Sequence, residues 1–138
     1  MSTQKILVVD DNPIVVKTLQ MQLAKAGFTV AVAMDGSEAI SAVRREKPDL
    51  IVLDISFPPD VSHGGGIPWD GFLIMQWLRR LDEAKTTPII IITGEDPAKY
   101  QAQAMKLGAT AFFAKPVDNH DLVEMINRTL AATATAAA

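Results

Sequence analysis

Five polar residues each follow a short apolar segment: Asp10, Asp11, Asp54, Thr93 and Lys115. In an open α/β sheet, ligands bind beyond the carboxyl ends of parallel strands, so these side chains are expected to share one cleft. Carboxylates that are brought together repel one another unless something positive enters the cluster. The pattern therefore predicts a site for a hard divalent cation with oxygen ligands, Mg²⁺ or Mn²⁺, beside a hydroxyl and an ammonium group.

Each of these residues taken alone has a simpler interpretation, because Asp and Thr commonly cap helices or end strands. For Asp10 or Asp11 alone, the cap is as good an explanation as a ligand role. The joint set is much harder to explain in that way, since acidic groups are rarely gathered without a partner. The functional interpretation therefore rests on all five positions lying at one edge of a sheet.

The elements that would position these residues alternate between buried strands and amphipathic helices. The expected strands are nearly continuous apolar runs, as in strands that are buried on both faces. They are Ile6–Val9, Phe28–Ala33, Leu50–Leu53, Ile89–Ile92 and Ala111–Ala114. Between and after them, apolar residues recur at helical spacing. The stripes are Val16, Leu19, Leu23 and Ala26; Ile74, Trp77, Leu78 and Leu81; and Val123, Ile126 and Leu130.

Turn and capping residues agree with this order. Helix starts are indicated by an N-cap residue followed by proline, and by a capping-box pattern. These signals are Asn12-Pro13, Asp96-Pro97, and Asp35 with Glu38; Gly27, Gly108 and Pro48 mark helix ends. Alternating units of this length require right-handed crossovers and helices on both faces of a parallel sheet. We therefore expect a doubly wound α/β fold with five parallel strands in the flavodoxin-like order 2-1-3-4-5.

Composition narrows the function classes. A chain of 138 residues suits one domain over residues 1–138, with a core over about 4–130. The chain has no cysteine, which excludes disulfides and thiolate chemistry, and a net charge of -3 gives no general attraction to nucleic acid or an anionic membrane. No apolar run has membrane-spanning length and no secretion signal is visible, so a cytoplasmic location is expected.

Two segments depart from the regular alternation. The loop over about 59–69, from Pro59 to Trp69, is rich in Pro and Gly and longer than usual for a strand–helix connection. A solvated loop is its simpler interpretation, and shielding of a group bound at Asp54 is the alternative. His63 has no second ligand nearby, and Gly64–Gly66 lacks the residues of a P-loop. The Ala/Thr segment over 131–138 is expected to fray beyond the last helix.

At these positions the chain resembles the receiver domains of two-component response regulators, including the chemotaxis-regulator type. The matching residues are Asp10-Asp11, Asp54, Thr93-Gly94-Glu95, Lys115-Pro116 and the preceding Gly108–Phe112. The resemblance runs from about Gln4 to Leu130, and its motifs stand in order at the expected strand ends. The family's short loop before an Asp-Gly at the third helix is replaced here by the longer segment that ends at Asp70-Gly71.

The resemblance implies a role for each matched residue. Asp54 would accept a phosphoryl group, and Thr93 and Lys115 would contact it. Mg²⁺ would be held by Asp11, Asp54 and the backbone carbonyl of Ser56, with Asp10 reaching the ion partly through water. Thr93 and Phe112 would act as the switch pair, although plain core packing also explains Phe112. The Lys115–Pro116 peptide bond would be cis.

The resemblance also implies the partners. A histidine kinase or phosphotransfer protein would supply the phosphoryl group, and a downstream protein would bind the surface of the fourth helix, fifth strand and fifth helix. No nucleic-acid contact and no membrane contact are expected, and homodimerisation is left open. On this view the chain is a signalling phosphoacceptor that catalyses only its own phosphorylation and dephosphorylation.

Three alternatives remain at this point. A haloacid dehalogenase-like phosphatase would place a second Asp two residues after its nucleophile, a pattern that Asp10-Asp11-Asn12 does not match. A binding module that signals without phosphate would not need the complete acidic set. The chain could also be a piece of a larger regulator or hybrid kinase.

Overall fold

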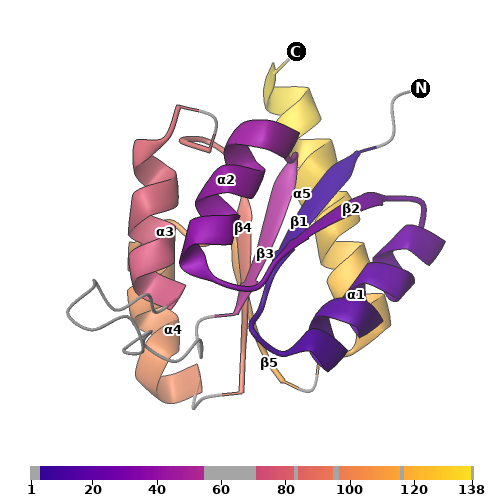
Figure 1. Ribbon diagram of the computed structural model, residues 1–138, viewed down its shortest axis with the longest axis horizontal. Helices are drawn as coiled ribbons and strands as arrows, with labels where there is room; N and C mark the ends of the chain where they lie inside the picture. Colours follow the sequence, from indigo (N-terminus) through magenta and orange to yellow (C-terminus); the bar gives the residue numbers. More distant parts are fainter. Residues whose placement is uncertain (1–3, 55–70, 83, 95–96, 116, 138) are drawn as a thin grey trace.

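The computed structural model describes residues 4–54, 71–82, 84–94, 97–115 and 117–137. Strands and helices alternate along the chain, as expected from the sequence. They are β1 (Lys5–Val9), α1 (Pro13–Lys25), β2 (Thr29–Ala33), α2 (Gly36–Glu46), β3 (Leu50–Asp54), α3 (Gly71–Arg80), β4 (Ile89–Thr93), α4 (Pro97–Lys106), β5 (Ala111–Ala114) and α5 (Asn119–Ala137). Figure 1 shows the strands side by side at the centre, with helices in front of and behind them.

The five strands form one parallel sheet in the order β2-β1-β3-β4-β5, which confirms the predicted topology. In the register, Val9 pairs with Leu53, and Asp54 pairs with Ile92. Thr93 pairs with Ala114 on the next strand. The strands β3 and β4 are each one residue longer than predicted, so Asp54 and Thr93 are the last residues of their strands and are held by the sheet itself.

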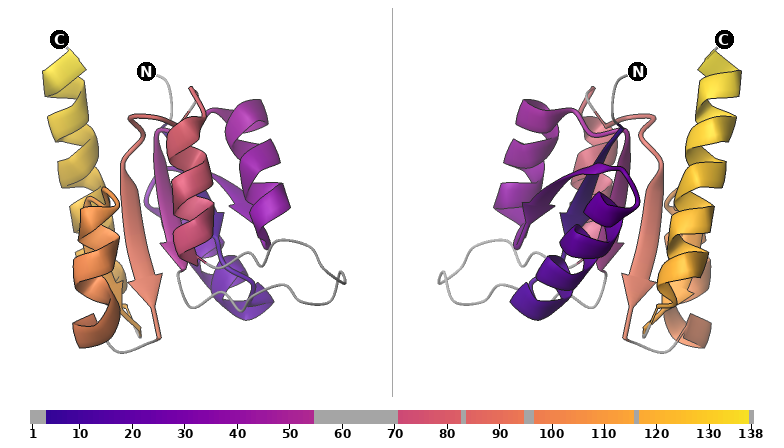
Figure 2. Two further views of the ribbon diagram at one scale, coloured as in Figure 1. Left: turned by 90° about the vertical axis from the view of Figure 1, so that its left-hand side faces the viewer. Right: turned by 90° about the vertical axis from the view of Figure 1, so that its right-hand side faces the viewer.

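The sheet separates two apolar layers, because successive side chains of a strand point to opposite faces. On one face, Leu53 and Ile91 pack against α3 and α2, with α4 at the margin. On the other face, Val52 and Ile92 pack against α1 and α5. The two side views show α5 on one side of the strands and α2 and α3 on the other (Figure 2). Strands buried on both sides explain why the predicted strands read as continuous apolar runs.

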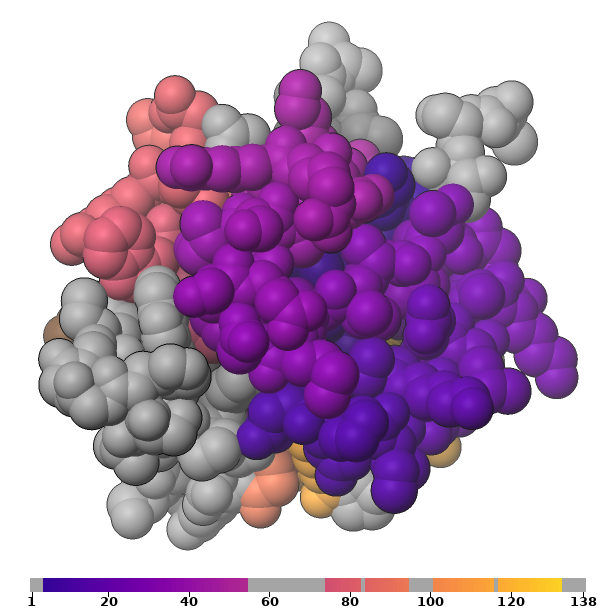
Figure 3. All heavy atoms as spheres, in the orientation of Figure 1, coloured from indigo at the N-terminus to yellow at the C-terminus, as the bar shows by residue number. Residues whose placement is uncertain are grey.

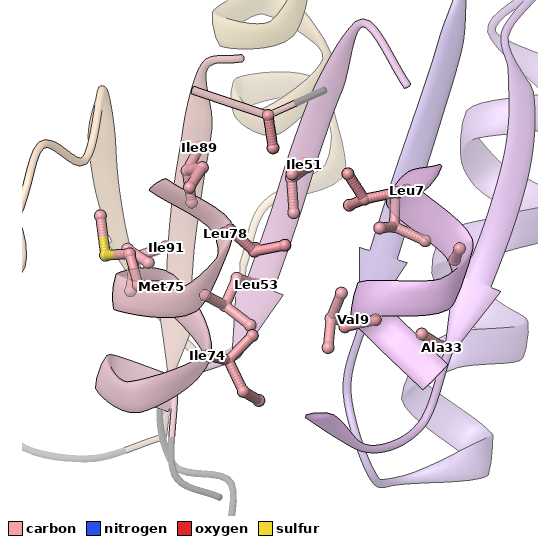
Figure 4. Packing of buried hydrophobic residues seen from close by; sticks show 14 of the residues in the cluster. Leu7, Val9, Ala33, Ile51, Leu53, Ile74, Met75, Leu78, Ile89 and Ile91 are labelled. Atoms are coloured by element: carbon pink, nitrogen blue, oxygen red, sulfur yellow. The ribbon is translucent and has the colours of Figure 1, made fainter. Parts of the chain in front are cut away.

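The α3 face of this core differs from the predicted stripe in one residue. Ile74, Leu78 and Leu81 are buried as expected, but Trp77 is 36% exposed and Met75 is fully buried instead. Figure 4 shows Ile74, Met75 and Leu78 reaching toward the strands. The prediction for Trp77 was wrong because Met75 is closer to the centre of the buried stripe of α3.

The other stripes have similar deviations at their margins. On α1, Ala26 is exposed because the helix has already ended at Lys25. On α5, Ile126 and Leu130 are buried as expected, whereas Val123 is half-buried and Leu122 is fully buried. In the space-filling view, α2 lies at the centre of the near face (Figure 3).

The predicted helix starts are confirmed where the structure describes them. The Asn12 side chain accepts the Ile14 N–H at 2.9 Å, and the Asp35 carboxylate accepts the Glu38 N–H at 2.8 Å. The helix α4 begins at Pro97, and the preceding Asp96 lies outside the described residues. These side chains satisfy amide groups that have no partner within the first turn of a helix.

The predicted helix ends also hold, and one of them has an unexpected residue. Gly27 and Gly108 adopt φ of 102° and 100°, which glycine accommodates without a steric cost. At the end of α2, before Pro48, the residue in the left-handed conformation is Lys47, with φ 49° and ψ 62°. A side chain in that conformation is strained by contact between its Cβ and the following carbonyl oxygen.

Replacing Lys47 with glycine is expected to stabilise the fold by about 1 kcal/mol, because relief of the left-handed strain exceeds the greater flexibility that glycine adds to the unfolded chain. Urea unfolding of Lys47→Gly and Lys47→Ala would measure the effect. Alanine keeps the Cβ, so Lys47→Ala should remain near the wild-type stability. Equal stability of the two variants would contradict the prediction.

Two predictions concern segments at the margins of the described structure. The helix α5 continues to Ala137, so residues 131–137, which were expected beyond the last helix, belong to it. Their fraying in solution stays a prediction. The loop over 59–69 lies outside the described residues. Among the described residues, no helix is both long enough and apolar enough to cross a membrane.

Candidate phosphoryl-acceptor site

The site lies where β1 and β3 end at the carboxyl edge of the sheet. Asp10 follows β1, and its own N–H donates to the Ala33 carbonyl at 3.1 Å, which extends the pairing with β2 by one residue. Asp54 ends β3 beside it. Asp10 is fully buried and Asp54 is 2% exposed, whereas Asp11 is exposed. The edge thus presents two buried carboxylates and one that faces solvent.

The carboxylates of Asp10, Asp11 and Asp54 are gathered as the sequence predicted. One carboxylate oxygen from each lies within 4.8 Å of the others. That spacing brings the three oxygens close enough to ligate one ion, since hard cations bind carboxylate oxygens at about 2.0–2.6 Å. Two of the donors are buried and held by sheet positions, so the donor set fits a small divalent cation.

Lys115 crosses from the end of β5 to the two buried carboxylates. Its Nζ lies 2.9 Å from Asp10 Oδ2 and 3.1 Å from Asp54 Oδ2. The backbone fixes its position, because the Lys115 N–H donates to the Thr93 carbonyl at 2.7 Å. Its side chain is 24% exposed. One ammonium group therefore bridges two carboxylates in a largely desolvated position.

The ionisation of this group reflects the balance between burial and charge. Burial is the largest influence on the pKa of Asp10 and raises it above its ordinary value, and the nearby charge of Asp54 raises it further. The Asn12 N–H, which donates to Asp10 Oδ1 at 2.9 Å, acts against this rise, as does Lys115. The ionised form of Asp10 is thus held at a cost in the metal-free protein.

For Lys115, burial is again the largest single influence, and it lowers the pKa. The hydrogen bond to Asp10, together with the charges of Asp54 and Asp10, outweighs burial, so the pKa of Lys115 is raised. The ammonium form is therefore stabilised by its carboxylate partners. Lys115 carries a full positive charge at neutral pH.

The remaining predicted residues lie beside this cluster or outside the described structure. Thr93 ends β4 with a fully buried side chain. Phe112, on β5, is partly buried and packs against the α2–α3 layer of the core, the contact that plain core packing requires. Ser56 and Pro116 lie outside the described residues, so the carbonyl ligand and the cis peptide bond stay predictions.

An open groove of about 500 Å³ adjoins the site. Apolar side chains from α1 form much of its wall, and Lys115 lies at its margin. Its lining residues are Ile14, Val15, Thr18, Leu19, Gln22, Ile92, Lys115 and Val117. The Ile14 side chain is 75% exposed.

One contact of the site was not predicted from the sequence. Asn12 was interpreted as a helix cap, and it also donates its backbone N–H to Asp10. The signal was present, since an Asp that is followed two residues later by a helix N-cap commonly accepts the N–H of that cap. Asn12 therefore links the start of α1 to the acidic cluster.

Fold and site together define a doubly wound α/β protein with an acidic, lysine-bridged cluster at the carboxyl edge of its sheet. The family model of the response regulator receiver domain matches residues 6–127, and the chain belongs to that family. The function of this family is to accept a phosphoryl group from histidine kinases in two-component signalling.

The chain is similar to whole proteins and to parts of longer ones. It is 33% identical to protein PilH of Pseudomonas aeruginosa over 92% of this chain and 98% of that protein. It is 36% identical to the alkaline phosphatase synthesis transcriptional regulatory protein PhoP of Bacillus subtilis, over 82% of this chain but 42% of PhoP. The chain thus spans less than half the length of some curated relatives.

The fold agrees with solved structures. A CheY-like receiver domain protein from Methanospirillum hungatei superposes with a TM-score of 0.84 at 25% identity, over 97% of this chain and 98% of that one. The likeness therefore covers the entire sheet and its surrounding helices.

Proposed function

We propose that Asp54 is the residue that accepts the phosphoryl group. The observation that carries this proposal is the Lys115 ammonium 3.1 Å from Asp54 Oδ2, at a point where three carboxylates come within 4.8 Å of one another. Asp54 is central to the cluster because it ends β3, the strand between β1 and β4. Its position at the carboxyl edge suits attack on a donor that approaches from solvent.

In the proposed reaction, an Asp54 carboxylate oxygen attacks phosphorus on the phosphohistidine of the donor. A new oxygen–phosphorus bond forms, the phosphorus–nitrogen bond breaks, and the imidazole nitrogen keeps the electron pair. A carboxylate nucleophile needs no base to remove a proton. The main barrier is repulsion between the carboxylate and the phosphoryl oxygens, so charge neutralisation is the main task of the site.

Asp10, Asp11 and Asp54 would hold Mg²⁺ or Mn²⁺, with the Ser56 carbonyl as a further oxygen donor. The fit rests on the spacing of the three carboxylates and on their hard oxygen donors. Bound there, the ion supplies positive charge that offsets the negative charge developing on the phosphoryl oxygens. The positive charge of the ion would also offset the energetic cost of desolvating the two buried carboxylates, Asp10 and Asp54.

Lys115 and Thr93 complete the proposed site. The Lys115 ammonium, now shared between Asp10 and Asp54, would pair with the phosphoryl oxygens after transfer. Thr93 ends the neighbouring strand and would donate its hydroxyl to the phosphoryl group, and Phe112 would move inward as Thr93 moves. The Lys115–Pro116 peptide bond would be cis.

The proposed output is a shift in the surface formed by α4, β5 and α5, which would bind a downstream protein. We assign the chain a role as a cytoplasmic signalling phosphoacceptor with one domain over 1–138, and no catalysis on other molecules. The phosphoryl donor would be a histidine kinase or a phosphotransfer protein.

Incubation with acetyl phosphate and Mg²⁺, followed by intact mass measurement, tests the proposal. The wild type should gain one phosphoryl group, and Asp54→Asn should gain none. Asp49→Asn is a matched control, because Asp49 accepts a backbone N–H at the opposite edge of the sheet, and it should gain one group. A gain that survives in Asp54→Asn would reject Asp54 as the acceptor. Repeated turnover of a phosphate ester would reject the non-enzyme role.

A further inference from the structure

The helix α4 is weakly held by apolar packing along the part whose side chains the structure describes. Of its residues 101–106, only Ala104 is buried, and Met105 is 44% exposed. A helical segment with so little buried apolar surface has a low free energy of local opening. The position of residues 101–106 on the sheet therefore depends on the C-terminal end of the helix as well as on the buried Ala104.

The C-terminal end of α4 is closed by backbone hydrogen bonds. The Gly108 N–H donates to the Met105 carbonyl at 3.1 Å, and the Ala109 N–H donates to the Ala104 carbonyl at 3.1 Å. This pattern, with Gly108 at positive φ, is a Schellman motif. Immediately after it, the Thr110 N–H donates to the Ile89 carbonyl at 2.8 Å and joins the turn to the start of β4.

Arg79, near the end of α3, links that turn to a second segment. Its Nη2 donates to the Gly108 carbonyl at 3.1 Å. Its Nη1 donates to the Ala84 carbonyl at 3.0 Å and the Thr87 carbonyl at 2.6 Å, both in the connection between α3 and β4. The guanidinium is planar and directs these donors in fixed directions, so it holds the two segments at a set separation.

The two ends of α4 therefore differ. The end beside Gly108 is held through Arg79 at the edge of the sheet where β4 and β5 begin. The other end, at Pro97, lies at the carboxyl edge close to Thr93, where the proposed site is (Figure 1). A change at the site would reach α4 at the end that Arg79 does not hold.

We infer that Arg79 anchors the C-terminal end of α4 and makes Gly108 the fixed point about which this helix moves. The movement rests on the proposed function, since phosphorylation of the site is what would displace the Thr93 end. The anchor itself does not depend on phosphorylation. Arg79 is thus a positioning residue, remote from the reacting atoms, that confines the displacement of α4 to the end near the site.

The anchor is tested by hydrogen–deuterium exchange of the metal-free protein. In Arg79→Met, amides of residues 104–110 should exchange about tenfold faster or more, because a hydrogen bond from a charged donor is lost. The amides of β1 and β3 report global unfolding and should change less. Arg80→Met is the matched control, because Arg80 is exposed and stacks over Trp77 at 5.4 Å, and it should leave residues 104–110 unchanged.

Arg79→Lys distinguishes the bridge, meaning the guanidinium hydrogen bonds to Gly108, Ala84 and Thr87, from an effect of the positive charge alone. Lysine keeps the positive charge near the helix end but offers a single nitrogen, so it cannot reproduce the paired donors that join the two segments. Fast exchange over 104–110 in Arg79→Lys supports the bridge, and full protection there would overturn it. Equal acceleration in residues 104–110 and in β1 and β3 of Arg79→Met would also overturn the inference, since Arg79 would then stabilise only the whole fold.

The fixed point is tested with beryllofluoride, a mimic of the phosphoryl group, and Mg²⁺. In the wild type, amide exchange should change over residues 98–102 and stay constant over 104–110, and in Arg79→Met the change should extend over both segments. A wild-type change as large at 104–110 as at 98–102 would overturn the fixed point. A wild type that binds no beryllofluoride would refute the proposed function and the coupled movement, whereas the metal-free comparison would still decide the anchor.

Discussion

Replacing Lys115 with methionine is expected to lower the free energy of unfolding of the metal-free protein by about 3 kcal/mol, as removal of one partner from a buried ion pair commonly does. Asp10 and Asp54 are 0% and 2% exposed, and both ion-pair with Lys115. Without the ammonium group, two neighbouring carboxylates would remain in a desolvated position. Urea unfolding in the presence of a chelator would measure the loss.

The control for this prediction is Lys17→Met, which removes an exposed lysine of α1 and should change the stability by less than about 0.5 kcal/mol. Excess Mg²⁺ should recover part of the loss in Lys115→Met, because the ion replaces the missing positive charge between the carboxylates. A loss no larger than that of Lys17→Met would show that the carboxylates do not depend on Lys115.

Asp10→Asn is expected to have opposite effects in the absence and presence of Mg²⁺. Without the ion, the variant should be more stable than the wild type by about 1 kcal/mol, because a buried charge beside Asp54 is removed while Lys115 keeps Asp54 as its charged partner and the Asn12 N–H keeps an acceptor. The affinity of the variant for Mg²⁺ should be at least about tenfold lower than that of the wild type, because one carboxylate ligand is lost. Saturating Mg²⁺ should then reverse the order of stability.

Asp11→Asn provides the comparison. Asp11 is exposed, so its replacement should also weaken Mg²⁺ binding but leave the metal-free stability within about 0.5 kcal/mol of the wild type. Calorimetric titration with Mg²⁺ and urea unfolding with and without the ion would measure both quantities. Loss of stability in metal-free Asp10→Asn would contradict the account of the buried charge.

The pH dependence gives a second check of the same variant. Because the pKa of Asp10 is raised in the folded protein, the native state binds this proton more tightly than the unfolded chain. The stabilisation that the protonated Asp10 contributes to the free energy of unfolding is therefore complete below the ordinary pKa of 3.8. It is lost as the pH rises through the raised pKa of the native state. The stability advantage of metal-free Asp10→Asn should accordingly grow from acid toward neutral pH.

Much of the fold and of the site follows from local patterns in the sequence. Buried parallel strands require long apolar runs, and the runs ending at Val9, Leu53 and Ile92 place the next polar residue at the carboxyl edge. The wide spacing of Asp10, Asp54 and Lys115 along the chain is therefore no obstacle to predicting their proximity. The strand order then brings them to one place.

Other features depend on contacts that no local pattern contains. Met75 is buried in the core where Trp77 was expected, and this depends on how α3 is rotated against the sheet, since both residues fit an apolar stripe. Arg79 donates to the carbonyl of Gly108, 29 residues away, and backbone carbonyls carry no sequence signature. Lys47 adopts a conformation that its type does not favour, so nothing in the sequence marked it.

The start of β1 and the end of α5 both lie at the edge of the sheet opposite the acidic cluster (Figure 1). A biotin tag or fluorescent fusion joined at either terminus would therefore leave the approach to Asp54 open. Immobilising the protein through the end of α5 would turn the cluster toward the bulk solution, which suits surface-based measurements of donor proteins.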